Sequence, residues 1–256
     1  MYPGDVTRES IRMRISLVIL LVAVGVACKK VNRDKLDEVM SENLVSDRAM
    51  NTMAGGGEFE FEGDLKYPVY VHFVHEGGAN DYRFFETKNK DSDPLDYSAY
   101  KEVKNVPTQG LYNGFMLALK LEESHDRWGI LTYQLGDSLR VSDPIEIKAI
   151  DRKTQTLGNF LEVDEDGLTP TFSWSDGSFQ ESDSFLFVIA DENDDAICAG
   201  ELNGNAWTFY DELSLTTDLI GSPMPVLEEG KTYSFTIFGI SENGWMNIKV
   251  TKSFNT

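Results

Sequence analysis

The sequence has few of the residues and motifs on which catalysis and metal binding usually depend. Its 256 residues include two cysteines, Cys28 and Cys198, and three histidines. It contains no Gly-x-Ser-x-Gly elbow, no glycine-rich phosphate loop and no histidine close to Cys198 in sequence. His72 and His75 lie three residues apart in an expected strand, which places them on opposite faces, so they cannot share a metal ion. These absences argue against a hydrolase, a nucleotide-binding protein or a zinc site of the common types.

Basic side chains are also scarce. The chain has 23 lysines and arginines against 43 aspartates and glutamates, a formal net charge of −20 and a pI of about 4.4. Such a charge repels nucleic acid and anionic lipid headgroups, so we expect no nucleic-acid partner. Solvated acidic faces are the usual explanation of this composition, and a specific cationic partner is the less common one.

The sequence has no apolar run long enough for an ordinary membrane span. Its longest run covers 13 residues, from Ile15 to Ala27, whereas a spanning helix needs about 20. Arg12 and Arg14 precede the run and Cys28 follows it. A positive start, an apolar segment of about 7 to 15 residues and small residues before the cut are typical of a secretory signal.

The end of this run resembles the box of bacterial lipoproteins, in which a small residue precedes an acylated cysteine. Gly25 and Ala27 are the small residues here, although Gly25 stands where that box usually has leucine. The resemblance implies a signal peptide over residues 1–27, lipid attachment at Cys28, and localisation in the outer membrane of a Gram-negative bacterium, on either of its sides. An ordinary secreted protein and a retained anchor helix are the alternatives. If Cys28 carries lipid, Cys198 has no partner and no disulfide is expected.

Residues 28–57 are expected to form a flexible tether between the membrane and the folded part. They are charged, and their few apolar residues, among them Leu36, Val39 and Leu44, predict at most a short amphipathic helix without a partner face. Short isolated helices are marginal in water. The run Gly55-Gly56-Gly57 that closes the segment is interpreted as a linker.

From residue 58 the hydrophobic period changes to two, which is typical of half-buried strands. We therefore predict a first antiparallel β-sandwich domain over residues 58–154. Polar turn chemistry near residue 155 separates it from a second domain over residues 155–256. The strands expected in the first domain cover residues 58–62, 67–74, 82–85, 114–121, 129–135 and 140–147, and those in the second cover residues 169–174, 184–190, 206–210, 227–237 and 247–254.

Residues 163–256 resemble the fibronectin type III fold. In that family an early strand carries a core tryptophan, matched here by Trp174. A later strand opens with a leucine, a glycine turn and a tyrosine whose hydroxyl bonds back to the corner, matched by Leu227, Gly230 and Tyr233. The resemblance implies a sandwich of two sheets about 10 Å apart. The expected fold class is therefore all-β, with two tandem antiparallel Ig-like or fibronectin type III-like sandwiches after a signal peptide and tether.

Acidic loops provide weak candidates for a calcium site, and no other metal or cofactor is expected. Asp91 and Asp93 lie in one such loop, and Asp191 and Asp194 lie in another. None of the acidic loops has the full ligand spacing of a calcium loop. Aspartate and asparagine are also the residues that hairpin turns prefer.

Aromatic residues at strand or loop ends are the remaining candidates for ligand contact: Trp245, Trp207, Tyr210 and Trp128. A flat ring in such a place stacks on a sugar or anchors a protein interface, and core packing is the alternative. Trp245 follows the turn residues Glu242-Asn243-Gly244, so we expect it to be exposed.

Two functions of different classes fit these observations. The first is a noncatalytic cell-envelope lipoprotein that acts as a binding or adhesion module and contacts a glycan or another envelope protein. The alternative is an accessory or cryptic hydrolase with a carboxylate pair between the two domains. We favour the first because nothing in the sequence assembles a nucleophile, a base and an oxyanion hole. A buried carboxylate pair about 5 to 9.5 Å apart in a cleft would favour the second.

Overall fold

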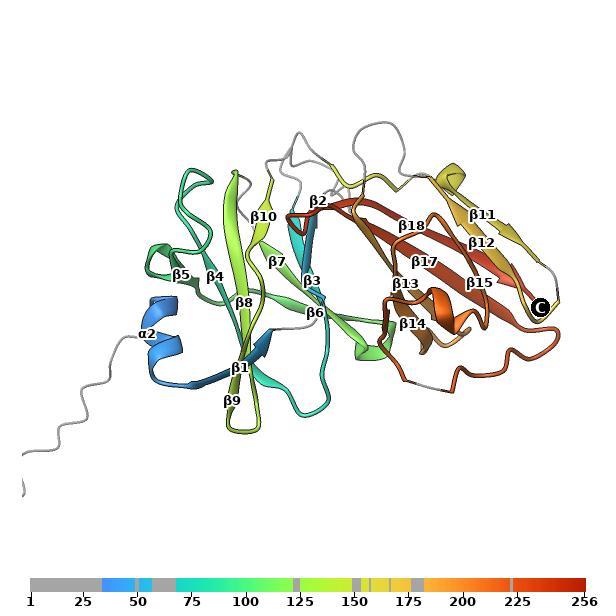
Figure 1. Cartoon of the computed structure of the whole chain (residues 1–256), viewed down its shortest axis with the longest axis horizontal. Helices are drawn as coiled ribbons and strands as arrows, with labels where there is room; N and C mark the ends of the chain where they lie inside the picture. Colours follow the sequence, from blue (N-terminus) through green and yellow to red (C-terminus); the bar gives the residue numbers. More distant parts are fainter. Residues whose placement is uncertain are drawn as a thin grey trace, which may run out of the picture. The chain divides into compact units, whose positions relative to one another are not determined.

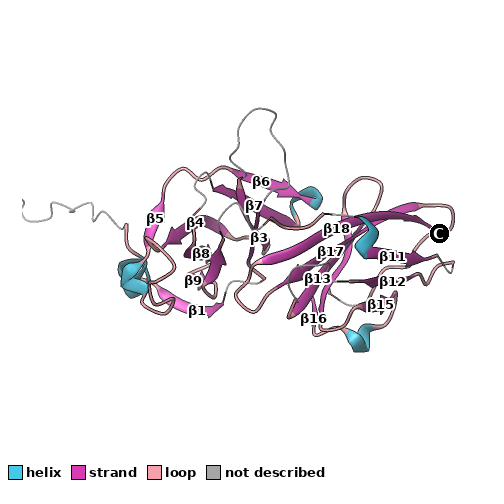
Figure 2. Cartoon of the chain, turned by 90° about the horizontal axis from the view of Figure 1, so that it is seen from above, coloured by secondary structure: helices cyan, strands magenta, loops and turns pink. Residues whose placement is uncertain are grey.

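The computed structural model describes residues 34–48, 51–56, 68–121, 125–148, 153–156, 158–165, 167–175, 182–221 and 223–256. The signal stretch, Cys28 and the strand expected at residues 58–62 lie outside these ranges. The regular elements of the described chain are nearly all β-strands, most of them paired antiparallel (Figures 1 and 2), which confirms the expected all-β class. Among the described residues, no helix has the length and hydropathy needed to cross a membrane.

The first sandwich consists of two sheets. One has the order β2-β3-β7-β6, with β2 (Met53–Gly56), β3 (Val69–Val74), β7 (Met116–Leu121) and β6 (Thr108–Leu111). The other has the order β1-β9-β8-β4-β5, with β1 (Leu44–Arg48), β9 (Ser138–Val141), β8 (Arg127–Leu135), β4 (Asn80–Glu86) and β5 (Lys101–Val103). The short strand β10 (Ile145–Ile147) also pairs with β8, and β1 runs parallel to β9.

Strand β3 is buried along its whole length, which explains its continuous apolar sequence. Val71 and Phe73 point into the core between the two sheets of the first sandwich. Val74 belongs to a separate apolar cluster shared with the second sandwich. A strand that is covered on both faces does not need the alternation of apolar and polar residues that a half-exposed strand shows.

The second sandwich also consists of two sheets. The smaller has the order β11-β12-β15, with β11 (Leu161–Asp164), β12 (Thr171–Trp174) and β15 (Ala206–Thr208). The larger has the order β16-β14-β13-β17-β18, with β16 (Thr217–Asp218), β14 (Ala196–Leu202), β13 (Ser184–Ala190), β17 (Thr232–Ile240) and β18 (Met246–Asn255). The rings of Phe172 and Phe235 stack between the sheets with centroids 4.0 Å apart.

The corner predicted from the fibronectin type III resemblance is present. The Tyr233 hydroxyl accepts a hydrogen bond from the backbone N–H of Glu228 at 3.1 Å. Leu227 is buried, and Gly230 adopts a φ of +76°, a conformation that favours glycine. Trp174 lies in the core, with its ring centroid 5.4 Å from that of Phe185. These contacts and the strand order confirm a fibronectin type III-like sandwich.

The tether predicted over residues 28–57 is wrong for its described part. Helix α2 (Leu36–Ser41) buries Leu36 and Val39 in a cluster that includes Tyr100 and Ile130 of the first sandwich. Strands β1 and β2 then belong to the two sheets of that sandwich, so Gly55 and Gly56 are strand residues and not a linker. The first sandwich thus includes residues well before the predicted start at residue 58.

Two further details differ from the expected strands. The single strand expected over residues 140–147 is divided into β9 and β10, and Pro144, which has no N–H to donate, lies in the break. Strands β5, β6 and β14 were not expected from the sequence. Short 3₁₀ turns complete the fold: η1 (Tyr97–Ala99), η2 (Tyr112–Gly114), η3 (Gly158–Phe160) and η4 (Glu212–Ser214).

Candidate functional site

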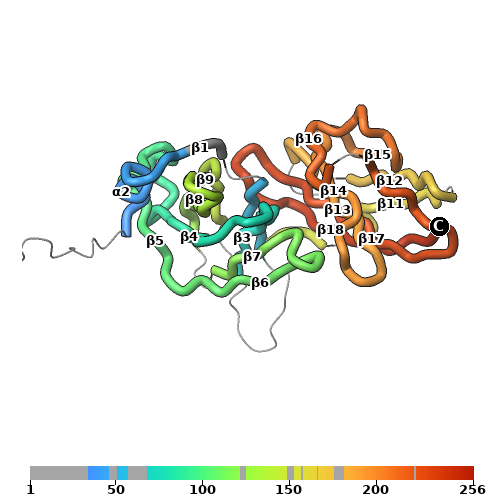
Figure 3. Tube along the Cα trace, turned by 90° about the horizontal axis from the view of Figure 1, so that it is seen from below, coloured from blue at the N-terminus to red at the C-terminus, as the bar shows by residue number. Residues whose placement is uncertain are grey.

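The turn between β17 and β18 inserts into the first sandwich. Trp245 is 2% exposed and packs in the core cluster of the first sandwich, which contains Ala54, Ile145 and Ile147. The backbone N–H of Ala54 donates to the Gly244 carbonyl at 2.9 Å. Figures 1 and 3 show β2 beside the start of β18. The expectation that Trp245 is exposed is therefore wrong, because the core of the other sandwich covers it.

A charged side chain borders the buried Trp245 ring. The Lys148 Nζ lies 5.8 Å from the ring centroid and 3.8 Å from a carboxylate oxygen of Glu146. The backbone N–H of Glu146 donates to the Asn243 carbonyl at 2.8 Å. The turn is thus held by backbone hydrogen bonds, by apolar packing and by a cation beside an aromatic ring.

Residues 153–156 also join the two sandwiches. The Thr154 hydroxyl accepts from the Gly56 N–H at 3.1 Å and donates to the Met246 carbonyl at 2.9 Å. A Cβ atom on Gly55 would lie 2.7 Å from the Thr154 Oγ1, so only glycine permits this close approach. The segment between the sandwiches is therefore part of the packed junction.

Apolar side chains from both sandwiches form the centre of the junction. Met53, Val74 and Met116 come from the first, and Leu186, Val188, Ala199, Phe238 and Met246 come from the second. His72 is buried nearby, 6.5 Å from the Phe238 ring. Burial, and secondarily the charge of Lys249, lower the pKa of His72 to about 3, so the imidazole is neutral at ordinary pH.

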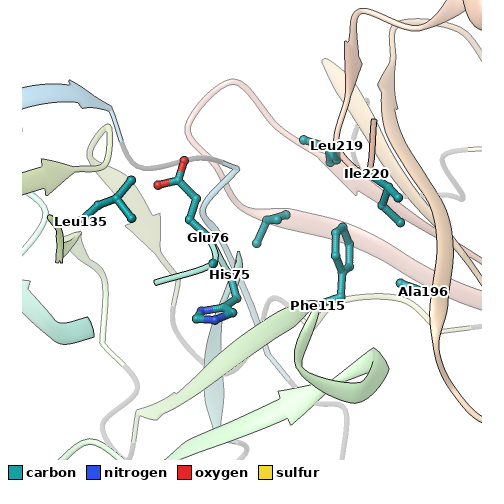
Figure 4. A pocket seen from close by; sticks show the side chains of 9 residues that line it. His75, Glu76, Phe115, Leu135, Ala196, Leu219 and Ile220 are labelled. Atoms are coloured by element: carbon teal, nitrogen blue, oxygen red, sulfur yellow. The ribbon is translucent and has the colours of Figure 1, made fainter. Parts of the chain in front are cut away.

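An open groove lies beside this junction, with a volume of about 510 Å³ (Figure 4). The first sandwich supplies the end of β3, the turn after it, the residue after η2, and β8. The second sandwich supplies β14 and the loop after β16. The lining residues are Val74, His75, Glu76, Gly77, Phe115 and Leu135 of the first sandwich and Ala196, Leu219 and Ile220 of the second. Figure 4 shows the Phe115 ring on the side of Ala196, Leu219 and Ile220, and the Glu76 carboxylate on the side of Leu135.

The polar groups of the groove are held by neighbouring side chains. The Tyr133 hydroxyl donates to Glu76 Oε2 at 2.9 Å, and the Arg140 Nε lies 3.9 Å from the same oxygen. The His75 Nδ1 and the Tyr82 hydroxyl are 2.5 Å apart. Burial, and then the charge of Glu76, raise the pKa of Tyr82, so its hydroxyl stays protonated. Side chains fixed in this way orient a ligand without having to be ordered on binding.

The groove does not contain the carboxylate pair of the hydrolase hypothesis. Among the described residues that line it, Glu76 is the single acid. Tyr133 and Arg140 contact that carboxylate, and no lining residue is a serine or cysteine. Among the described residues, the groove therefore lacks the carboxylate pair that the hydrolase hypothesis requires.

The other aromatic candidates lie away from the groove. Trp207 is buried in the core of the second sandwich, its ring 4.4 Å from that of Phe187, so the expected role in ligand contact does not fit its position. Trp128 is half-buried, and its indole N–H donates to the Lys90 carbonyl at 3.2 Å. Tyr210 is 39% exposed, with its hydroxyl donating to the Pro225 carbonyl at 3.0 Å. Of the four candidate aromatic residues, solvent reaches Tyr210 and part of Trp128.

The acidic loops show turn chemistry. The Asp191 Oδ1 accepts from the backbone N–H groups of Asn193 and Asp195 at 2.8 and 3.0 Å, and these bonds lower the pKa of Asp191. Asp194 adopts a φ of +65° in the same turn. In the other loop, which also contains Asp91, the Asp93 Oδ1 accepts from the Leu95 N–H at 2.9 Å. Among the residues that the structure describes, no three His, Cys, Asp or Glu side chains are placed to hold a metal ion.

Comparison with known proteins gives distant structural likeness only. No protein-family model and no curated protein sequence matches the chain. Among solved structures, the FN1–FN3 domains of chicken CNTN1 are 9% identical with a TM-score of 0.27, covering 84% of this chain and 69% of that one. A chain of a cytokine receptor complex is 12% identical with a TM-score of 0.26, covering 75% and 92%. The chicken interferon gamma receptor alpha chain is 12% identical with a TM-score of 0.25, covering 81% and 97%.

Proposed function

We propose that this protein is a noncatalytic binding or adhesion module of the bacterial envelope, anchored to the outer membrane through lipid on Cys28. Its ligand site is the groove between the two sandwiches. The observation that carries the proposal is the construction of this groove. Apolar side chains from both sandwiches form its walls, and a few polar groups are fixed by their neighbours. Ligand sites in proteins are typically concave, mostly apolar and formed before the ligand binds.

The junction supports a preformed site. The apolar cluster centred on Phe238 and Met246 and the inserted Trp245 resist relative movement of the two sandwiches. The side chain of Asn113 adds a polar tie, because it donates to the Asn193 carbonyl at 3.1 Å and to Asp195 Oδ1 at 2.7 Å. A groove between two bodies joined in this way keeps its shape without a ligand.

The anchor proposal rests on the sequence around Cys28. Because α2 already packs on the first sandwich, only residues 28–33 separate the lipid from Asp34.

Fractionation of cells that express the full chain tests the anchor. We expect the wild type to stay with the outer membrane after carbonate extraction and to incorporate an alkyne-tagged fatty acid. Cys28→Ala should lose both properties, and Cys198→Ala, the matched control, should keep them. A Cys28→Ala variant that remains in the membrane and carries the label would contradict acylation at this residue.

A ligand screen with groove variants tests the binding site. Wild type, Phe115→Ala and the surface control Leu213→Ala would be applied to arrays of glycans and of envelope peptides. We expect ligands that the wild type and Leu213→Ala retain and that Phe115→Ala loses. Equal retention by all three proteins would exclude the groove as the site.

A further inference from the structure

Charge is distributed very unevenly along the chain. Residues 154–230 contain 17 aspartates and glutamates and no lysine, arginine or histidine. This segment supplies one wall of the groove, made by Ala196, Leu219 and Ile220. This segment therefore supplies apolar groups to the groove and carries charges of one sign.

Acidic side chains flank the lining residues of both walls. Asp218 precedes Leu219 and is exposed, but it pairs with Gly200 and so lies on the other face of the strand from Leu219. Asp195 precedes Ala196 and accepts from Asn113. Across the groove, Glu76 is itself a lining residue, and the exposed Asp137 follows Leu135 by two positions.

A cation beside Glu76 offsets part of this charge. Arg140 is half-buried, and its Nε lies 3.9 Å from Glu76 Oε2. Residues 154–230, which supply the other wall, include no cation. The field at the groove is therefore negative.

We propose that the groove binds a basic, amphipathic polypeptide segment of a partner protein. The inference rests on the proposed function, because it assumes that the groove is the ligand site. Apolar side chains of the partner pack against Phe115 and Ile220, and its lysines or arginines lie at the acidic rim. An uncharged glycan gains nothing from the rim carboxylates, whereas a cationic peptide gains both affinity and association rate.

Three soluble probes test this ligand class with the full chain in neutral detergent. The first is a peptide of about 12 residues that alternates leucine and lysine, the second has glutamate in place of lysine, and the third is cellohexaose. We expect the lysine peptide to bind and the glutamate peptide not to bind. Raising the salt concentration from about 50 mM to about 500 mM should lower the affinity for the lysine peptide by about tenfold or more, because exposed charges are then screened.

Any acidic protein attracts a cationic peptide, so the assignment to the groove depends on a substitution that changes no charge. Ile220→Ser removes an apolar wall residue, and Leu213→Ser is its control, at a side chain of the same sandwich that is 99% exposed. We expect Ile220→Ser to lower the affinity for the lysine peptide by about fivefold or more and Leu213→Ser to leave this affinity unchanged. Asp195→Asn keeps an oxygen that can accept from Asn113, and it should weaken binding more than Glu212→Gln, an exposed acid in η4.

The outcomes separate this inference from the proposal that the groove is a binding site. If cellohexaose binds and Ile220→Ser abolishes its binding, the groove is the site and the ligand class is wrong. If the lysine peptide binds equally to Ile220→Ser and Leu213→Ser, its attraction is nonspecific and the inference fails. If the groove substitutions affect none of the three probes, both the ligand class and the groove assignment are rejected.

Discussion

Ala54 and Trp245 lie side by side as partners in a parallel β-bridge. Ala54 belongs to β2, and Trp245 belongs to the turn between β17 and β18. The pair joins a strand of the first sandwich to the second sandwich. Trp245 fills space in a core built by residues far from it in sequence. The two sandwiches therefore depend on each other for burial of apolar surface, and we expect them to unfold together.

Trp245→Ala tests this dependence. Removing a buried tryptophan leaves a cavity, and the expected loss is about 3 to 5 kcal/mol of unfolding free energy. Urea denaturation of the full chain, followed by far-ultraviolet circular dichroism, measures it. Leu213→Ala is the control, because its side chain is solvated and its loss should be small. If the two variants have equal midpoints, the inserted tryptophan does not stabilise the junction.

Tyr233 and Trp174 differ in how they stabilise the second sandwich. Tyr233→Phe removes only the hydrogen bond from the Glu228 N–H, at an expected cost of about 0.5 to 1.5 kcal/mol. Trp174→Ala creates a cavity beside Phe185 and should cost about 3 to 5 kcal/mol. Guanidinium denaturation of both variants compares them. A larger loss for Tyr233→Phe than for Trp174→Ala would show that the corner, and not the core, limits stability.

Cys198 should be unreactive in the folded protein. Burial, and then the charges of Asp218 and Glu212, raise the pKa of its thiol to about 12, so little thiolate forms at neutral pH. We expect iodoacetamide at pH 8 to leave Cys198 unmodified until urea unfolds the chain. Peptide mass spectrometry locates the adduct. Rapid labelling of Cys198 without denaturant would contradict its burial in the core.

His72 should make stability depend on pH. Its folded pKa of about 3 lies below the ordinary value of 6.5, so between these values the unfolded chain binds a proton that the folded chain does not. Stability is therefore lost as the pH falls from 6.5 towards 3, by up to about 1.4 kcal/mol per pH unit. His72→Gln should reduce this slope, and Leu213→Ala, which removes no titratable group, should not. Urea melts at several pH values measure the slopes, and equal slopes for both variants would contradict the account of His72.

The second sandwich was more predictable than the first because its signals are local. Leu227, Gly230 and Tyr233 lie within seven residues, and the turn between them requires a glycine with positive φ. Trp174 is readable because Phe172 occupies the same face of the strand. In the first sandwich no such motif appears, since the core residues are spread over strands whose pairing depends on the whole fold.

The junction and the groove were not predictable because their contacts join distant parts of the chain. Trp245 follows turn residues and looks exposed, but residues of another sandwich cover it. Gly55 resembles a linker glycine, although its missing side chain makes room for Thr154. The groove combines His75 and Glu76 with Leu219 and Ile220, and no motif connects these positions. Sequence patterns report local geometry, whereas these features come from tertiary packing.

If the two sandwiches form one rigid body with a preformed groove, the distance between two spin labels, one on each sandwich, should take a single value. Labels at Asp137→Cys and Leu213→Cys, both exposed and on different sandwiches, would be introduced into a Cys28→Ala chain, with the buried Cys198 left unlabelled. Double electron–electron resonance should give one narrow distance distribution, which broadens when Trp245→Ala is added. A broad or bimodal distribution in the chain that retains Trp245 would contradict a fixed junction and a preformed groove.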